Sequence, residues 1–425
     1  MSLAGHLPAK AWCLLSLSLV CSALLGGCAP APAKDDSSTS QADLVSVDPA
    51  RELMITDLSV VEDPVRTAWT SSPSDEEQGA WTFGRLMANM SGTHSPSDYV
   101  LKWLKTWETA QVVNGFTVAA RPNVRTLITN PWRQVSGCAL DDSPCTLDFS
   151  KAPFRLLAIV NRLDLRTFAD DRGGTAGQGR FVFGALRPDG TKLFFTVIFE
   201  YALLAEVRDD IVAWANRWHR LARYPFGSTY NQELQRVTNR FAGRDVADDR
   251  PNGSALLQLR TNEVALGVPW QLREFNISST TGYLELVTVK QTPDISFNNT
   301  QALADFINAN ADAINNNRSN PPAAMLGGSA LTPGFPNPGP QDFVWRAPGV
   351  AEGLRHQFAI QTCNGCHLSE TGTRFTHVKP RDAGVKTVLS DFLTQTALPA
   401  RVSDMVNILT YGDSDDHDEL GDVRD

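Results

Sequence analysis

Hydrophobic and polar positions change periodicity several times along the middle of the chain. Residues 153–165 begin as a continuous apolar run and end in alternation, which predicts a largely buried strand. Two β-rich stretches, 180–186 and 191–201, flank an Arg-Pro-Asp-Gly turn at 187–190 and predict a hairpin. Further strands are expected at 256–260, 270–275 and 282–289.

Helical spacing of apolar side chains appears on both sides of these strands. It predicts amphipathic helices at 99–107, 207–221, 230–241 and 300–317, and a closing helix at 399–409. Trp103 and Trp107 stand four residues apart and are expected to anchor a hydrophobic core. Because strands and helices occur in blocks, the pattern predicts an α+β fold and not a regular doubly wound sheet.

One short segment near the end of the chain, Cys363-Asn364-Gly365-Cys366-His367, has CxxCH spacing. Two thiols on one helical turn can each add to a haem vinyl group, and the adjacent histidine can ligate the iron. With 7 Cys and 7 His in 425 residues, chance would produce this pattern about 0.002 times. The pattern predicts one covalent c-type haem, held by Cys363 and Cys366, with His367 as proximal ligand.

The N-terminus predicts export. A weakly basic start and the apolar stretch 11–25 predict a signal peptide over 1–27. The apolar stretch is too short to span a membrane. It ends in Leu-Gly-Gly-Cys, which resembles the bacterial lipobox and predicts lipidation of Cys28. A polar, proline-rich tether follows at 28–53. We expect a lipid-anchored protein of the cell envelope. Ala29 after the cysteine favours the outer membrane, facing the periplasm or the cell surface.

Every cysteine of the exported chain then has an assignment. Cys138 and Cys145 enclose a turn-rich loop and are expected to form a disulfide in an oxidising compartment. Cys363 and Cys366 remain for the haem. An alternative stays open, in which these two thiols form a disulfide or bind zinc together with His367 and His377.

The charge balance bears on the partners. The formal net charge of −9 becomes −10 once Lys10 leaves with the signal peptide, which argues against nucleic-acid binding. The acidic tail at 413–419 is expected to be a solvated terminus, or else a docking patch for a basic redox partner. A redox partner protein is the partner that a haem predicts, together with the membrane that a lipid anchor contacts.

Composition also suggests how the chain is divided. An α+β domain of unknown function is expected at 54–317, and a Pro/Gly-rich linker at 318–348. A small, mainly α-helical haem-binding segment with an acidic tail is expected at 349–425. This segment is small for a free-standing cytochrome and is expected to pack against the larger domain to bury the porphyrin.

The sixth iron ligand is left open by the sequence. His377 lies ten residues after His367, on a loop long enough to round the edge of a porphyrin. Met405, inside the closing helix, is the alternative, and an open or water-ligated position is the third. The basic residues Arg374, Lys379 and Arg381 either pair with haem propionates or face solvent.

The larger domain offers no recognisable catalytic set, so an electron carrier is expected rather than an enzyme. Its polar residues near apolar strands are expected to be buried, hydrogen-bonded structural groups: Arg162, Asp164, Glu200 and Glu263.

Two resemblances add to these observations. The order Gly353, Phe358, Cys363 resembles the lead-in helix of c-type cytochromes, with each gap one residue longer. The segments 154–166, 260–263 and 362–367 resemble an uncharacterised family of exported lipoproteins of myxobacterial type, which implies a shared fold but no activity. We therefore expect one-electron transfer by a lipid-anchored haem protein. The alternatives are a haem enzyme or sensor with an open iron position, and a non-haem binding or structural lipoprotein.

Overall fold

The computed structural model describes residues 45–72, 77–169, 173–332 and 344–412. The predicted signal peptide, Cys28, the first part of the tether and the acidic tail lie outside the described residues. The strands are β1 (Met54–Ile55), β2 (Gln111–Val113), β3 (Phe116–Val118), β4 (Phe154–Arg162), β5 (Thr167–Ala169), β6 (Gly173–Leu186), β7 (Lys192–Ala205), β8 (Leu256–Asn262), β9 (Gln271–Leu272), β10 (Glu274–Ile277), β11 (Leu284–Val287) and β12 (Ala330–Leu331).

Helices lie before, between and after the long strands, and the α+β prediction is confirmed. The helices are α1 (Pro49–Glu52), α2 (Leu58–Val61), α3 (Phe83–Met90), α4 (Pro96–Lys105), α5 (Asn130–Val135), α6 (Arg208–His219), α7 (Ser228–Ala242), α8 (Gln301–Ala309), α9 (Ala311–Asn315), α10 (Glu352–Ala359), α11 (Cys363–Cys366) and α12 (Leu398–Tyr411). The first helix starts before position 54, so helical structure begins within the stretch expected to be tether.

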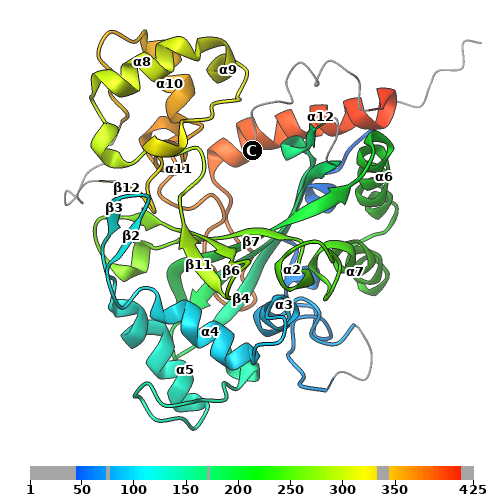
Figure 1. The fold of residues 1–425 in the computed structure, drawn as a ribbon. Coiled ribbons are helices and arrows are strands. Elements are labelled where there is room, and N and C mark those ends of the chain that lie inside the picture. The colour runs from blue at the N-terminus through cyan, green and yellow to red at the C-terminus, as the bar shows by residue number, and fades with distance from the viewer. Residues whose placement is uncertain (1–44, 73–76, 170–172, 333–343, 413–425) are drawn as a thin grey trace, which may run out of the picture. The chain divides into compact units, whose positions relative to one another are not determined.

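An antiparallel sheet forms the centre of the fold, with the strand order β1-β4-β6-β7-β8-β10-β11 and with β5 paired to β6 (Figure 1). The predicted hairpin is its middle, formed by β6 and β7, each 14 residues long. Both arms are longer than the sequence pattern indicated. The expected helix at 300–317 is in fact two, α8 and α9, which meet at Asn310.

One face of the sheet is apolar. Phe181 and Phe183 of β6 and Phe199 of β7 point to this face, because alternate residues of a strand share a side. The ring of Phe83 in α3 lies 5.9 Å from that of Phe183, and the ring of Phe241 in α7 lies 6.0 Å from that of Phe181. Helices of the first and middle parts of the chain therefore bury this face.

The opposite face of the same strands is polar. Arg180 of β6 pairs with Glu200 of β7, and Glu200 pairs in turn with Gln258 of β8. Gly184 belongs to the same alternating set, and a Cβ built there would lie 3.4 Å from the side chain of Pro380. The C-terminal part of the chain therefore covers the polar face.

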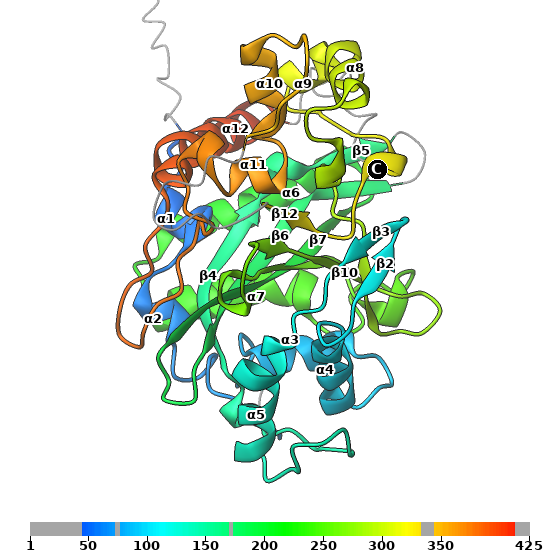
Figure 2. The same cartoon turned by 90° about the vertical axis from the view of Figure 1, so that its left-hand side faces the viewer.

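A second hydrophobic core holds part of the C-terminal segment. It contains these buried residues of α8, α9, α10 and the segments around them: Leu303, Phe306, Ile307, Ile314, Trp345, Phe358, Ala359 and Leu368. Figure 2 shows α8, α9, α10 and α11 gathered together, while α12 runs beside α6 in Figure 1. Cys363 and Phe375 pack against a third, small core around Trp270 and Leu272. The segment expected as one haem-binding part is thus divided among three cores, within a single compact unit that starts at Val45.

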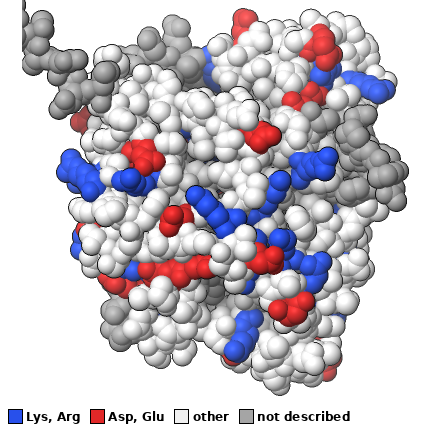
Figure 3. All heavy atoms as spheres, turned by 180° about the vertical axis from the view of Figure 1, so that it is seen from behind, with Lys and Arg blue, Asp and Glu red and all other residues white. Residues whose placement is uncertain are grey.

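Acidic and basic side chains are interspersed on the face shown in Figure 3. Among the described residues, no helix combines the length and the apolar character needed to cross a bilayer.

Candidate functional site

The CxxCH segment forms one tight helical turn, α11, whose shape is set by its neighbours in the sequence. The Thr362 hydroxyl caps the turn by accepting a hydrogen bond from the Gly365 amide, at 3.1 Å. The indole of Trp345 donates to the Thr362 hydroxyl and to the Asn364 side-chain oxygen, both at 2.9 Å. A Cβ at Gly365 would lie 2.0 Å from the Ala359 carbonyl oxygen, so only glycine fits there.

The two cysteines of this turn are free thiols in a desolvated position. Burial raises the pKa of Cys366 to about 12, and it also raises the pKa of Cys363. Thiol–disulfide enzymes lower the pKa of their attacking cysteine instead. The two protonated thiols thus differ from the thiolate that a redox-active CxxC pair needs.

His367 has one ring nitrogen fixed and one available. Its Nδ1 lies 2.8 Å from the carbonyl oxygen of Phe375, and the Phe375 amide donates to the His367 carbonyl at 2.9 Å. Because a carbonyl only accepts, the proton is on Nδ1 and the lone pair is on Nε2. Burial lowers the pKa of His367 to about 4, so the ring is neutral at pH 7.

A relay of side chains holds the carbonyl that orients His367. The Asn262 amide group donates to the same Phe375 carbonyl oxygen, and the Trp270 indole donates to Asn262 Oδ1 at 2.9 Å. The Trp270 ring also stacks on the His367 ring, with centroids 5.8 Å apart. Phe375 has φ +63°, a strained value for a bulky residue, and these bonds hold it there.

The structure brings His377 into direct contact with the CxxCH turn. Its Nε2 lies 3.4 Å from Cys366 Sγ, and its ring centroid lies 4.6 Å from that of His367. Its Nδ1 is 2.8 Å from the Ser390 hydroxyl. Two imidazoles in edge contact leave no gap for a porphyrin between them. His377 can reach the far side of an iron held by His367 only if its loop moves.

Met405, the other expected sixth ligand, lies elsewhere. It is 1% exposed in the main hydrophobic core, and its sulfur accepts a weak bond from Asn161 of β4 at 3.9 Å. The thioether is therefore packed against the sheet.

Four arginines form a group near the CxxCH turn that the sequence pattern does not reveal; three of them act on its thiols, and the fourth lies among the other three. They are Arg162 of β4, Arg180 of β6, Arg260 of β8 and Arg401 of α12. The charges of Arg162 and Arg401 act on the Cys366 thiol, and the charge of Arg260 acts on the Cys363 thiol. A sequence signal existed: the polar residues of β8 at 258, 260 and 262 alternate with buried neighbours in a central strand.

The basic residues suggested for propionate binding lie differently. Arg374 and Lys379 are exposed. Arg381 is buried and its guanidinium is engaged within the protein, because it donates to the Leu156 carbonyl at 2.9 Å and pairs with Glu62. Arg381 therefore ties the C-terminal segment to the sheet.

Two other expectations concern structural residues. Glu263 is fully buried and pairs with Arg121 and Arg273, so its structural role is confirmed. Cys138 and Cys145 are joined by a disulfide.

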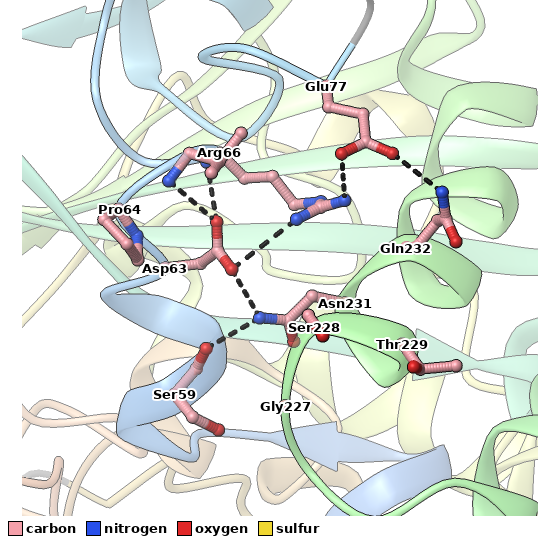
Figure 4. A pocket seen from close by; sticks show the side chains of 11 residues that line it. Ser59, Asp63, Pro64, Arg66, Glu77, Gly227, Ser228, Thr229, Asn231 and Gln232 are labelled. Atoms are coloured by element: carbon pink, nitrogen blue, oxygen red, sulfur yellow. Dashed lines mark hydrogen bonds and ion pairs between the residues drawn. The ribbon is translucent and has the colours of Figure 1, made fainter.

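A pocket of about 430 Å³ lies beside α2 and the start of α7, away from these residues. Its charged groups face one another, with Arg66 between Asp63 and Glu77 (Figure 4). None of the expected haem-site residues lines it. These ion pairs neutralise Arg66 within the pocket wall, so we assign the charged groups a structural role.

The described residues contain no group of three or more His, Cys, Asp or Glu side chains placed to hold a metal ion. No protein-family model, no curated protein and no solved structure matches the chain.

Proposed function

We propose that the protein is a lipid-anchored, cell-envelope carrier of one covalent c-type haem that transfers one electron at a time. The observation that carries this proposal is the geometry of α11. Two unpaired thiols lie on one helical turn, next to a neutral histidine whose Nδ1 is tied to a backbone carbonyl. Cys363 and Cys366 would hold the haem through thioether bonds, and His367 Nε2 would ligate the iron.

The residues around α11 support His367 as a ligand of a haem iron. A histidine that ligates a metal ordinarily donates its other ring N–H to a carbonyl or a carboxylate, which fixes the ring and raises its basicity. His367 makes this bond to Phe375 O. When bound, the haem supplies an iron that cycles between two oxidation states, and the protein tunes it through ligands and burial.

The side chains around α11 hold the His367 ring in place and shield it from solvent. Trp270 packs on one side of the His367 ring, and Asn262 fixes the carbonyl that receives the His367 proton. Charged side chains of the sheet lie near enough to the two thiols to act on them electrostatically: Arg162, Glu200, Arg260 and Glu274.

A second candidate, a haem enzyme or sensor with an open iron position, is favoured by the placement of His377 and Met405. One imidazole touches His367 directly, and the thioether is packed in the core. Carbon monoxide binding to the reduced, haem-loaded protein separates the two candidates. Rapid binding supports the open position, whereas resistance to carbon monoxide supports a carrier with two strong axial ligands.

Haem-stained electrophoresis of the full chain, produced together with cytochrome maturation factors, tests the proposal itself. We expect a stained band at full length and no stain in the variant Cys363→Ala/Cys366→Ala. The matched control is Cys138→Ala/Cys145→Ala, which removes two other cysteines and should keep the stain. An unstained wild-type band would overturn the proposal.

A further inference from the structure

The four arginines around α11 come from separate parts of the chain and converge on one side of the sheet. Arg162 and Arg180 stand on the neighbouring strands β4 and β6, Arg260 stands on β8 beyond β7, and Arg401 belongs to α12. Each side chain keeps some accessible surface: 17% for Arg162, 14% for Arg180, 16% for Arg260 and 12% for Arg401. Desolvation is nevertheless the largest influence on the pKa of all four. All four side chains are therefore largely buried but keep some contact with solvent.

The cluster has more positive than negative charge. Three carboxylates neutralise it in part. Asp164 is held by Arg162 at 2.8 Å, Glu200 lies 3.2 Å from Arg180, and Glu274 lies 2.8 Å from Arg260. Among the described residues, four arginines against three carboxylates leave a surplus of one positive charge.

Arg401 carries this surplus. Among the described residues its guanidinium makes one ion-pair contact, from Nε to Asp164 Oδ2 at 3.7 Å, and no hydrogen bond. Burial first, and then the charge of Arg162, lower its pKa to about 10. Burial also lowers the pKa of Arg180 to about 9, with Arg162 and Arg260 adding to the effect. Crowded like charges of this kind are relieved when an anion binds.

We propose that Arg401, together with Arg162, Arg180 and Arg260, forms a carboxylate-binding site beside the CxxCH turn. The planar guanidinium of Arg401 presents donors in the fork that a carboxylate accepts with both oxygens. If the proposed haem function holds, on which this assignment of the ligand rests, the propionate groups of the haem are the carboxylates bound. A free carboxylate is the other source of the same chemistry.

The experiment uses the full mature chain produced without maturation factors, so that no haem is attached. Tryptophan fluorescence, which includes Trp270 beside His367, reports binding of iron protoporphyrin and of its dimethyl ester. We expect the diacid to bind at least about tenfold more tightly than the diester, since charged hydrogen bonds are the strong ones. Arg401→Gln should remove most of that difference. Arg236→Gln, whose side chain is 63% exposed on α7, should leave it intact.

A second arm identifies the source of the carboxylate. Succinate is added to the same haem-free chain, and the melting temperature is measured for wild type and Arg401→Gln. Stabilisation by succinate that requires Arg401, without porphyrin binding, supports a site for free carboxylates while the haem function fails. If neither the diacid–diester difference nor the succinate effect depends on Arg401, the carboxylate site is overturned.

Discussion

At the scale of single residues, Gly365 is the most constrained position of the candidate site. An added Cβ would overlap the Ala359 carbonyl oxygen at 2.0 Å, and a backbone atom cannot turn away as a side chain can. We expect Gly365→Ala to destabilise the protein by about 3 kcal/mol and to abolish haem attachment, because α11 must open to admit the methyl group.

Gly353 provides the matched control for this substitution. It lies in α10 with nothing within 4 Å of a built Cβ. Gly353→Ala should therefore be neutral or stabilising by up to about 1 kcal/mol. Urea unfolding of both variants measures the difference, and equal stabilities would contradict the close packing at Gly365.

The two histidines of the site predict a pH dependence of the haem-free chain. The folded pKa of His367 is about 4 and that of His377 is well below 6.5, the value of both in the unfolded chain. Between pH 6.5 and about 4 the unfolded chain therefore binds more protons than the folded chain. Stability should be complete above pH 6.5 and fall as the pH drops, by about 1.4 kcal/mol per pH unit for each histidine.

The comparison of wild type with His377→Gln isolates this effect. Chemical unfolding between pH 7 and 5 should give a shallower pH slope for the variant, since one titrating group is lost. An unchanged slope would show that His377 is not buried against His367 as described.

At the scale of elements, β8 links the sheet to the site. Its last residue, Asn262, bridges the Trp270 indole and the carbonyl that orients His367. Asn262→Leu leaves the buried indole N–H without its acceptor and should cost about 2 kcal/mol. Trp270→Phe removes that donor, so the double variant should lose less than the sum of the two single losses. Urea unfolding of the four proteins measures this coupling, and strict additivity would contradict the relay.

The sequence predicted these elements unevenly. Turn residues and apolar periodicity were sufficient for the β6–β7 hairpin and for α6 and α7, because those signals are local. The polar face of the sheet was not recognised. Its residues, such as Arg180 and Glu200, come together only through strand pairing, and pairing register is a long-range property. The sequence alone identifies Glu200 only as a single buried polar group, and it does not single out Arg180.

At the scale of the whole molecule, the C-terminal segment has no core of its own. Helix α10 shares a core with α8 and α9, Cys363 of α11 packs against the cluster around Trp270 and Leu272, and α12 packs on α6. The isolated fragment 349–425 should therefore lack stable tertiary structure, whereas the chain 45–412 should unfold in one cooperative transition. Circular dichroism during thermal unfolding distinguishes these outcomes. A folded fragment, or two separate transitions in the longer chain, would contradict this organisation.

Composition alone does not indicate how the parts of this chain pack together. A Pro/Gly-rich stretch favours extended or turning backbone, but it does not reveal whether the segments on either side pack together. Here Trp345, near the end of that stretch, is buried in a core with residues of α8 and α9 before the stretch and of α10 after it. The CxxCH motif was found from sequence because its chemistry is contained in five consecutive residues.

Intact-mass spectrometry of the mature chain, made with cytochrome maturation factors and denatured before analysis, tests the central claim most directly. The account predicts a mass higher than that of the polypeptide by one haem, retained after denaturation because the thioether bonds are covalent. A chain with no added mass, or one lighter by the two hydrogens of a Cys363–Cys366 disulfide, would contradict it.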